Sequence, residues 1–128
     1  FGGGINNAGT MTLTDSPITG NSAASLGGGI LNGEAGTLTL TNITLSDNVA
    51  EFGGGVNNAG TMTLTDSTVT DNSVSGVGGG IANRGGTVTL SDTTVTGNVA
   101  LESPDIFNLD GTVVGYVPTA ADKAARPD

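Results

Sequence analysis

Glycine triplets recur along the chain at a nearly constant spacing, and this repeat limits the possible folds more than any other feature. The triplets begin at Gly2, Gly27, Gly53 and Gly78, so the intervals between them are 25, 26 and 25 residues. A period of this length is typical of a solenoid, in which each repeat forms one coil and packs only against its neighbours. The sequence therefore predicts a stack of similar coils.

Each repeat contains three short segments with the signature of β-strands. In the middle segment Met11 and Leu13 alternate with Thr10, Thr12 and Thr14, and later repeats keep this alternation. A period of two residues predicts strands with aliphatic side chains facing inward and Thr side chains facing outward. The inward column of the third segment is Ile18, Leu45, Val69 and Val95. For the first segment we predict two buried columns: Phe1, Leu26, Phe52 and Val77, and Ile5, Ile30, Val56 and Ile81.

These patterns predict an all-β fold, a right-handed parallel β-helix with about 25 residues and three short strands per coil. We expect four full coils and a partial fifth, which begins at Ser103 where the glycine triplet is lost. Pro104 lacks a backbone donor, and Val114 and Tyr116 stand at outward Thr positions, so this coil is expected to be the last.

The β-helix is expected to cover residues 1–117, followed by a polar tail or cap over 118–128 with a short helical turn from Ala120 to Arg126. At the other end Phe1 already occupies a strand position, so the first coil presents an open edge. We expect that edge to pair with preceding sequence of a longer chain, or with a second copy stacked head to tail.

Two columns of asparagine recur, one after the first strand and one after the third. Stacked Asn side chains can hydrogen-bond to the next coil and to turn backbone. We interpret both columns as structural ladders that join successive coils. The first ladder is Asn7, Asn32, Asn58 and Asn83, and the second is Asn21, Asn48, Asn72 and Asn98.

The outward threonines of the middle strand form the most regular surface feature. They should lie in a flat grid, roughly 4.8 Å apart between coils and roughly 6.8 Å apart along a strand. Such a grid resembles the faces of ice-binding solenoids, but Thr also suits any exposed strand. We expect an ordinary solvated face and keep ice binding as the alternative. The grid comprises Thr10, Thr12, Thr14, Thr37, Thr39, Thr41, Thr61, Thr63, Thr65, Thr87, Thr89 and Ser91.

The glycine triplets allow two interpretations. Inward glycines, such as Gly3 and Gly28, indicate tight packing on a narrow side of the helix, which we prefer. Outward glycines would leave a bare strip of backbone that another chain could approach closely. The glycines predicted to face outward are Gly2, Gly4, Gly27 and Gly29.

Composition excludes several functional classes. The chain has 12 Asp and Glu against 3 Lys and Arg, a net charge of -9, so a nucleic-acid partner is not expected. It has no Cys and no His, which removes thiol nucleophiles, imidazole bases and zinc fingers. No apolar run approaches the roughly 20 residues of a membrane-spanning helix, so membrane insertion is not expected. No cofactor is predicted.

Acidic residues also form columns at the corners of the coils. Asp15, Asp66 and Asp92 share one corner with Asn42, and carboxylates one coil apart could bind calcium or act as acid and base. Turn chemistry explains these positions more simply, because Asp and Asn satisfy local backbone groups. The body of the repeat offers a single cationic group, Arg84, to handle an acidic sugar. A polysaccharide-active enzyme is therefore the third alternative, with no catalytic residues assigned.

The motif Gly27-Gly28-Gly29-Ile30 followed by Leu45-Ser46-Asp47-Asn48 resembles the repeats of polymorphic outer membrane proteins. Those repeats pair a Gly-Gly-x-Ile-like motif with a Phe-x-x-Asn-like motif, whose aromatic residue is aliphatic here, as in Val69-Thr70-Asp71-Asn72. The resemblance implies a pectin-lyase-like β-helix in a secreted or cell-surface bacterial protein. We therefore expect a non-catalytic structural or adhesive segment, with a host or matrix surface as its partner.

Overall fold

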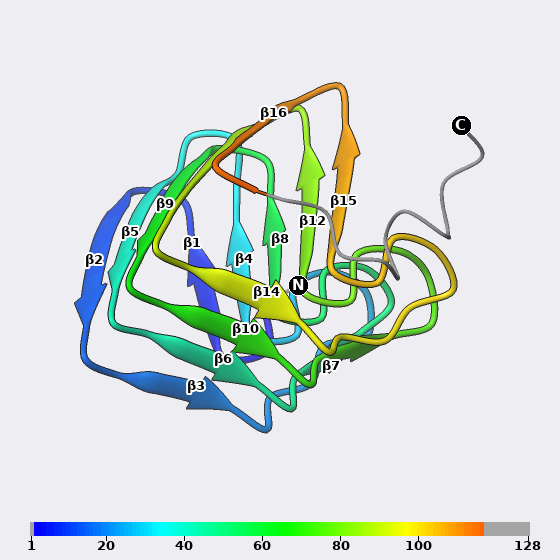
Figure 1. Ribbon diagram of the computed structural model, residues 1–128. Helices are drawn as coiled ribbons and strands as arrows, with labels where there is room; N and C mark the ends of the chain where they lie inside the picture. Colours follow the sequence, from blue (N-terminus) through cyan, green and yellow to red (C-terminus); the bar gives the residue numbers. More distant parts are fainter. Residues whose placement is uncertain (1, 117–128) are drawn as a thin grey trace.

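The three segments of each repeat form three parallel sheets, and a computed structural model describes them over residues 2–116 (Figure 1). The first sheet contains, in spatial order, β1 (Ile5–Asn7), β4 (Ile30–Asn32), β8 (Val56–Asn58), β12 (Ile81–Arg84) and β15 (Ile106–Leu109). The middle sheet contains β2 (Thr10–Thr14), β5 (Thr37–Thr41), β9 (Thr61–Thr65), β13 (Thr87–Ser91) and β16 (Thr112–Val114). The third sheet contains β3 (Pro17–Thr19), β6 (Thr44–Ser46), β10 (Thr68–Thr70) and β14 (Thr94–Thr96).

The register confirms the repeat predicted from sequence. Ile5 pairs with Ile30, and Thr10 pairs with Thr37, although the loop between these positions is longer in the second coil. Turn length therefore varies while the strands stay aligned. The described residues form a parallel β-solenoid of about four turns with no helix, which confirms the predicted fold class.

A fourth, very short sheet follows the third and was not predicted. It pairs β7 (Val49–Ala50) with β11 (Ser73–Val74), and single bridges from Ser22 to Val49 and from Ser73 to Val99 extend it. Ser and Val alternate down this column, so no common residue type marks it in the sequence. Three predicted strands per coil are correct for the main sheets only.

The corners between sheets use left-handed backbone, which few residue types accept. The corner between the middle and third sheets is occupied by Asp15, Asn42, Asp66 and Asp92, with φ between 48° and 54°. The corner after the third sheet is occupied by Gly20, Asp47, Asp71 and Gly97, with φ between 56° and 70°. Asn and Asp are the non-glycine residues most often found in this conformation, so the acidic columns follow from the need for sharp turns.

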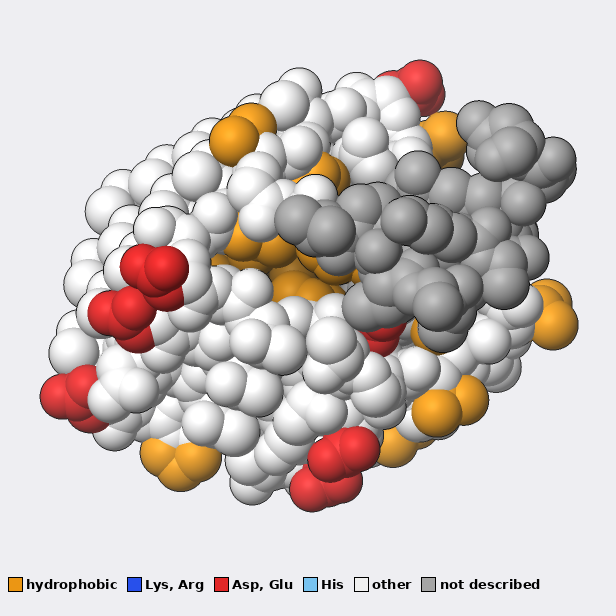
Figure 2. Space-filling view, in the orientation of Figure 1, with side chains coloured by type: hydrophobic (Ala, Val, Ile, Leu, Met, Phe, Trp, Pro, Cys, Tyr) orange, Lys and Arg blue, Asp and Glu red, His pale blue; other side chains and the backbone are white. Residues whose placement is uncertain are grey.

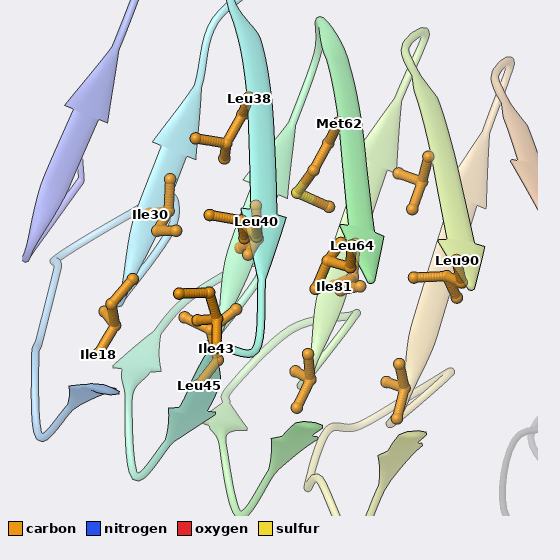
Figure 3. Packing of buried hydrophobic residues seen from close by; sticks show 14 of the residues in the cluster. Ile18, Ile30, Leu38, Leu40, Ile43, Leu45, Met62, Leu64, Ile81 and Leu90 are labelled. Atoms are coloured by element: carbon orange, nitrogen blue, oxygen red, sulfur yellow. The ribbon is translucent and has the colours of Figure 1, made fainter. Parts of the chain in front are cut away.

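The core is a stack of aliphatic side chains contributed by all three main sheets (Figure 3). Ile30, Leu38 and Leu45, each from a different sheet of one coil, are at most 1% exposed. The prediction for the column Leu26, Phe52 and Val77 is wrong, because these residues are only half-buried. The left-handed glycine that follows each of them turns the chain, so the preceding side chain lies outside the stack. Phe1 lies outside the described residues.

The glycine triplets pack one coil tightly against the next, which agrees with the preferred interpretation of the repeat. A Cβ atom placed on Gly28 would lie 2.5 Å from the carbonyl oxygen of Gly54 and 2.6 Å from that of Val49. The prediction that Gly27 and Gly29 face outward is wrong, because both are buried. No bare backbone strip therefore runs along the internal coils; of the glycines predicted to face outward, only Gly4 of the first coil is exposed.

The last described strand, β16, ends at Val114, and the prediction that Tyr116 stands at an outward position is wrong. Gly115 has a φ of 85° and turns the chain, so Tyr116 packs against the hydrophobic core instead of facing outward. Val114 does stand at an outward Thr position and is exposed. The predicted tail over 118–128, with its helical turn from Ala120 to Arg126, lies outside the described residues.

Candidate functional site

The first asparagine ladder runs inside the solenoid. Each Asn occupies the last inward position of its strand in the first sheet, and Asn32, Asn58 and Asn83 are fully buried. The Nδ2 group of each donates to the Oδ1 atom of the next: Asn7 to Asn32 at 2.9 Å, Asn32 to Asn58 at 2.8 Å, Asn58 to Asn83 at 2.9 Å, and Asn83 to Asn108 at 2.8 Å. The four residues thus form one continuous hydrogen-bonded column, and each also donates to a carbonyl oxygen of the turn that follows its strand.

In the second ladder, an internal Asn hydrogen-bonds to both the preceding and the following coil. The backbone N–H and the Nδ2 group of Asn48 both donate to Oδ1 of Asn72, at 3.0 and 2.9 Å. The same Nδ2 group reaches back to the carbonyl oxygen of Ile18 at 2.9 Å. Asn21, Asn72 and Asn98 repeat the forward pattern. The second column is therefore also continuous from Asn21 to Asn98.

Asp105 ends the second ladder, a role that sequence analysis missed. Its Oδ1 atom accepts the backbone N–H of Asn98 at 3.2 Å and the Nδ2 group of Asn98 at 3.0 Å. Asp105 takes the place of the third glycine of a triplet, where an added Cβ on Gly80 would meet the Asn98 side chain. A side chain at that position reaches the ladder directly, so one Asp replaces the Asn of a further coil.

The threonine grid is in register across the whole middle sheet. One outward column pairs Thr10, Thr37, Thr61, Thr87 and Thr112, and a second pairs Thr12, Thr39, Thr63 and Thr89. The third column pairs Thr14, Thr41, Thr65 and Ser91. Val114 ends the second column. The grid thus exists as predicted, as a face of stacked hydroxyl and methyl groups that carries no charged side chain.

The acidic corners are spread out, and the described residues contain no group of three or more acidic side chains that could hold a metal ion. Asn42 interrupts the column of carboxylates and donates through Nδ2 to Oδ1 of Asp15 at 2.7 Å. Figure 2 shows Asp and Glu side chains at separate points of the face in view. The column is consistent with turn chemistry.

A cation–π contact outside the core was not predicted. The Arg84 guanidinium lies over the Phe52 ring, 4.3 Å from its centroid, on the outer side of the first sheet. The Nε atom of Arg84 and the Oδ1 atom of Asn57 are buried without hydrogen-bond partners among the described residues. The cation–π contact accounts for the position of the guanidinium, but it gives the Nε atom of Arg84 no hydrogen-bond acceptor.

No protein-family model, curated protein or solved structure matches the chain. In the part of the chain that the structure describes, no helix is long and apolar enough to cross a membrane.

Proposed function

We propose that the chain is a rigid, non-catalytic module of a secreted or cell-surface bacterial protein. In this proposal it is similar in type to polymorphic outer membrane protein repeats and other pectin-lyase-like β-helices. Its acidic, Thr-rich exterior keeps the stack soluble, and its partner is a host or matrix surface that the module holds at a distance. The residue motifs described above support the likeness.

The observation that carries this proposal is the continuity of the two ladders. Buried Asn side chains in the internal coils bond to the coil before and the coil after, so their chemistry is used to hold the stack together. A buried amide that lost these partners would be left unsatisfied, at about 1–3 kcal/mol for each group. Separating two coils therefore breaks two amide contacts together with three sheets, which makes the stack stiff.

Single-molecule pulling between residues 1 and 128 tests this proposal. A load-bearing module should resist extension and then unfold in one cooperative event. Asn72→Ala should lower the unfolding force, whereas the exposed Ser75→Ala change in the same coil should leave it unchanged. Coils that peel away one at a time at low force, with no effect of Asn72→Ala, would contradict the proposal.

Ice binding is the second candidate, and the in-register threonine grid is the observation that favours it. An ice-recrystallisation assay should compare the wild type with the double variant Thr39→Leu and Thr63→Leu. Thr96→Leu, an exposed Thr of the third sheet, is the matched control. Activity that survives in the control and disappears in the double variant supports this candidate. Equal, negligible activity in all three proteins overturns it.

A polysaccharide-active enzyme stays a prediction. The test is release of sugars from polyuronates together with a calcium titration followed by thermal unfolding, with Asp66→Ala as the control. Sugar release, or stabilisation by calcium that Asp66→Ala abolishes, would replace the structural proposal.

A further inference from the structure

Both phenylalanines of the described part of the chain lie on the outer side of the first sheet. Phe107 continues the outward column formed by Leu31, Asn57 and Ala82, and both Phe52 and Phe107 are half-buried. The threonine grid carries no aromatic side chain. Partly exposed aromatic rings give a large and rigid contact area, so binding surfaces are enriched in them. The outer side of the first sheet is therefore the better candidate for a binding surface.

Glycine turns cover part of this outer side and give it a defined shape. A Cβ atom placed on Gly53 would lie 2.8 Å from the backbone nitrogen of Asn57, and one placed on Gly78 would lie 2.9 Å from Cβ of Ala82. Asn57 and Ala82 therefore point outward and are nevertheless at most 3% exposed. Phe52 directly precedes Gly53, so the turn places its ring beside the covered strands.

Arg84 is the one Lys or Arg in the part of the chain that the structure describes, and it has no anionic partner there. Asp110 follows Leu109, the residue that pairs with Arg84. Glu51 precedes Phe52, the ring on which the guanidinium lies. Neither carboxylate forms an ion pair with the guanidinium. The Nε atom is buried, whereas the terminal Nη groups make no hydrogen bond among the described residues and reach solvent.

Asn57 supplies the second unpaired group on this side of the sheet. It is 3% exposed, its Oδ1 atom is buried without a partner, and its Nδ2 group makes no hydrogen bond among the described residues. Asn57 pairs with Ala82, which lies two residues before Arg84, so the amide and the guanidinium share one outward face in neighbouring coils. A polar side chain at this depth is unfavourable unless a partner is supplied from outside.

We propose that the outer site formed by Phe52, Asn57 and Arg84 binds the carboxylate of a sugar acid at the end of an otherwise neutral glycan. The terminal nitrogens of a guanidinium bind a carboxylate through two parallel hydrogen bonds, and the Phe52 ring holds the guanidinium in place. Sugar hydroxyl groups both donate and accept hydrogen bonds, which matches the amide of Asn57. Phe107 offers an apolar surface to the C–H groups of the sugar ring.

The charge of the chain favours a ligand with one carboxylate over a ligand with many. A net charge of -9 repels a polyuronate, whose repeated carboxylates would meet the exposed Asp and Glu side chains. A single acid at the end of a neutral glycan avoids most of that repulsion and keeps the contact with Arg84. The inference rests on the proposed function, because it names the chemistry of the surface that the module contacts. Pulling measures stiffness without a ligand, so the two proposals fail separately.

NMR titration of the 128-residue protein tests the proposal. Sialyllactose, which carries one carboxylate on a neutral disaccharide, should shift the Nε–H resonance of Arg84, whereas lactose should not. Backbone amide shifts then give the affinities of the variants. Arg84→Gln should weaken binding about tenfold or more, because hydrogen bonds to a charged group are lost. Arg84→Lys should weaken it less, since the charge remains without the planar fork. Phe52→Leu should weaken it about threefold.

Thr96→Gln, which changes an exposed residue of the third sheet, is the control and should bind like the wild type. Circular dichroism shows that each variant is folded, and Arg84→Lys serves alone if Arg84→Gln is not. A polygalacturonate oligomer should bind more weakly than sialyllactose, and tighter binding of that polyanion would overturn the proposal. Tighter binding of a peptide with one Glu would assign the site to a protein partner and also overturn it. So would the absence of any shift with sialyllactose, or equal affinities of the wild type and both Arg84 variants.

Discussion

The two asparagine ladders stack the same residue through the same coils, yet they hold different parts of the backbone. In the first ladder, Nδ2 of Asn58 reaches the carbonyl oxygen of Gly60 in its own turn as well as the next Asn. In the second, Nδ2 of Asn72 reaches the carbonyl oxygen of Leu45 in the preceding coil as well as the next Asn. Both side chains join a coil to its two neighbours, but their backbone partners differ: Asn58 binds its own turn and Thr87 of the next coil, whereas Asn72 binds Leu45 of the preceding coil and Thr70 of its own.

The two ladders also differ in the number of hydrogen bonds that each Oδ1 atom accepts. Oδ1 of Asn58 receives one hydrogen, from Nδ2 of Asn32, whereas Oδ1 of Asn72 receives both the backbone N–H and Nδ2 of Asn48. Identical residues at matching sequence intervals therefore need not contribute equally to stability. The number of buried groups that each oxygen satisfies decides the difference.

The largest expected effect comes from Asn72→Ala. The change removes the acceptor of two donors on Asn48 and the donors to Leu45 and Asn98, all buried. We expect the free energy of unfolding to fall by about 4 kcal/mol, since each buried unsatisfied group is unfavourable by about 1–3 kcal/mol. Urea denaturation measures the loss, with Ser75→Ala as the control. A loss within the error of that control would show that the second ladder adds nothing to stability.

Asn58→Ala should have a smaller effect, about 2 kcal/mol, because only one donor, on Asn32, loses its acceptor. The turn carbonyl at Gly60 also loses its side-chain partner. Both variants should be unfolded in urea under the same conditions, since the informative quantity is the difference between them. Equal losses would refute the comparison between the ladders.

Asp105 allows the end of the second ladder to be tested. Asp105→Ala leaves the backbone N–H and Nδ2 of Asn98 without their acceptor and should lower stability by about 2 kcal/mol. Asp105→Asn keeps an oxygen in place and should lose about 1 kcal/mol or less, the difference between a charge-assisted and a neutral hydrogen bond. Hydrogen exchange at the Asn98 amide should speed up in Asp105→Ala. Unchanged exchange there would mean that Asp105 does not end the ladder.

The fold could be predicted from sequence because a repeat multiplies each signal. One Asn after one strand says little, but a column of them at intervals of about 25 residues requires stacking. The alternation of Thr with aliphatic residues then assigned the faces of the middle sheet correctly, as the register of Thr39 with Thr63 shows.

The errors arose where one residue changes the direction of the chain. A left-handed glycine such as Gly53 reverses the alternation, so Phe52 lies outside the core although its spacing suggested otherwise. Asp105 was missed because it occurs once and occupies a glycine position. A column of mixed Ser and Val residues likewise concealed the fourth sheet. Periodicity therefore predicts the repeated strands, whereas the direction of the chain at the corners and the end of a ladder depend on single residues.

The smallest expected effect on stability comes from the left-handed corner after the third sheet, which directly precedes the second ladder. Asp71, at a φ of 56°, directly precedes Asn72, and Gly20 and Gly97 occupy the same corner in other coils. Asp71→Gly should therefore leave stability nearly unchanged, whereas Asp71→Ala should lose about 1 kcal/mol, because a Cβ without a polar partner disfavours left-handed backbone. Urea denaturation of both variants measures this difference. If Asp71→Gly proved the more destabilising, the carboxylate itself, and not the backbone angle, would be what holds Asn72 in the ladder.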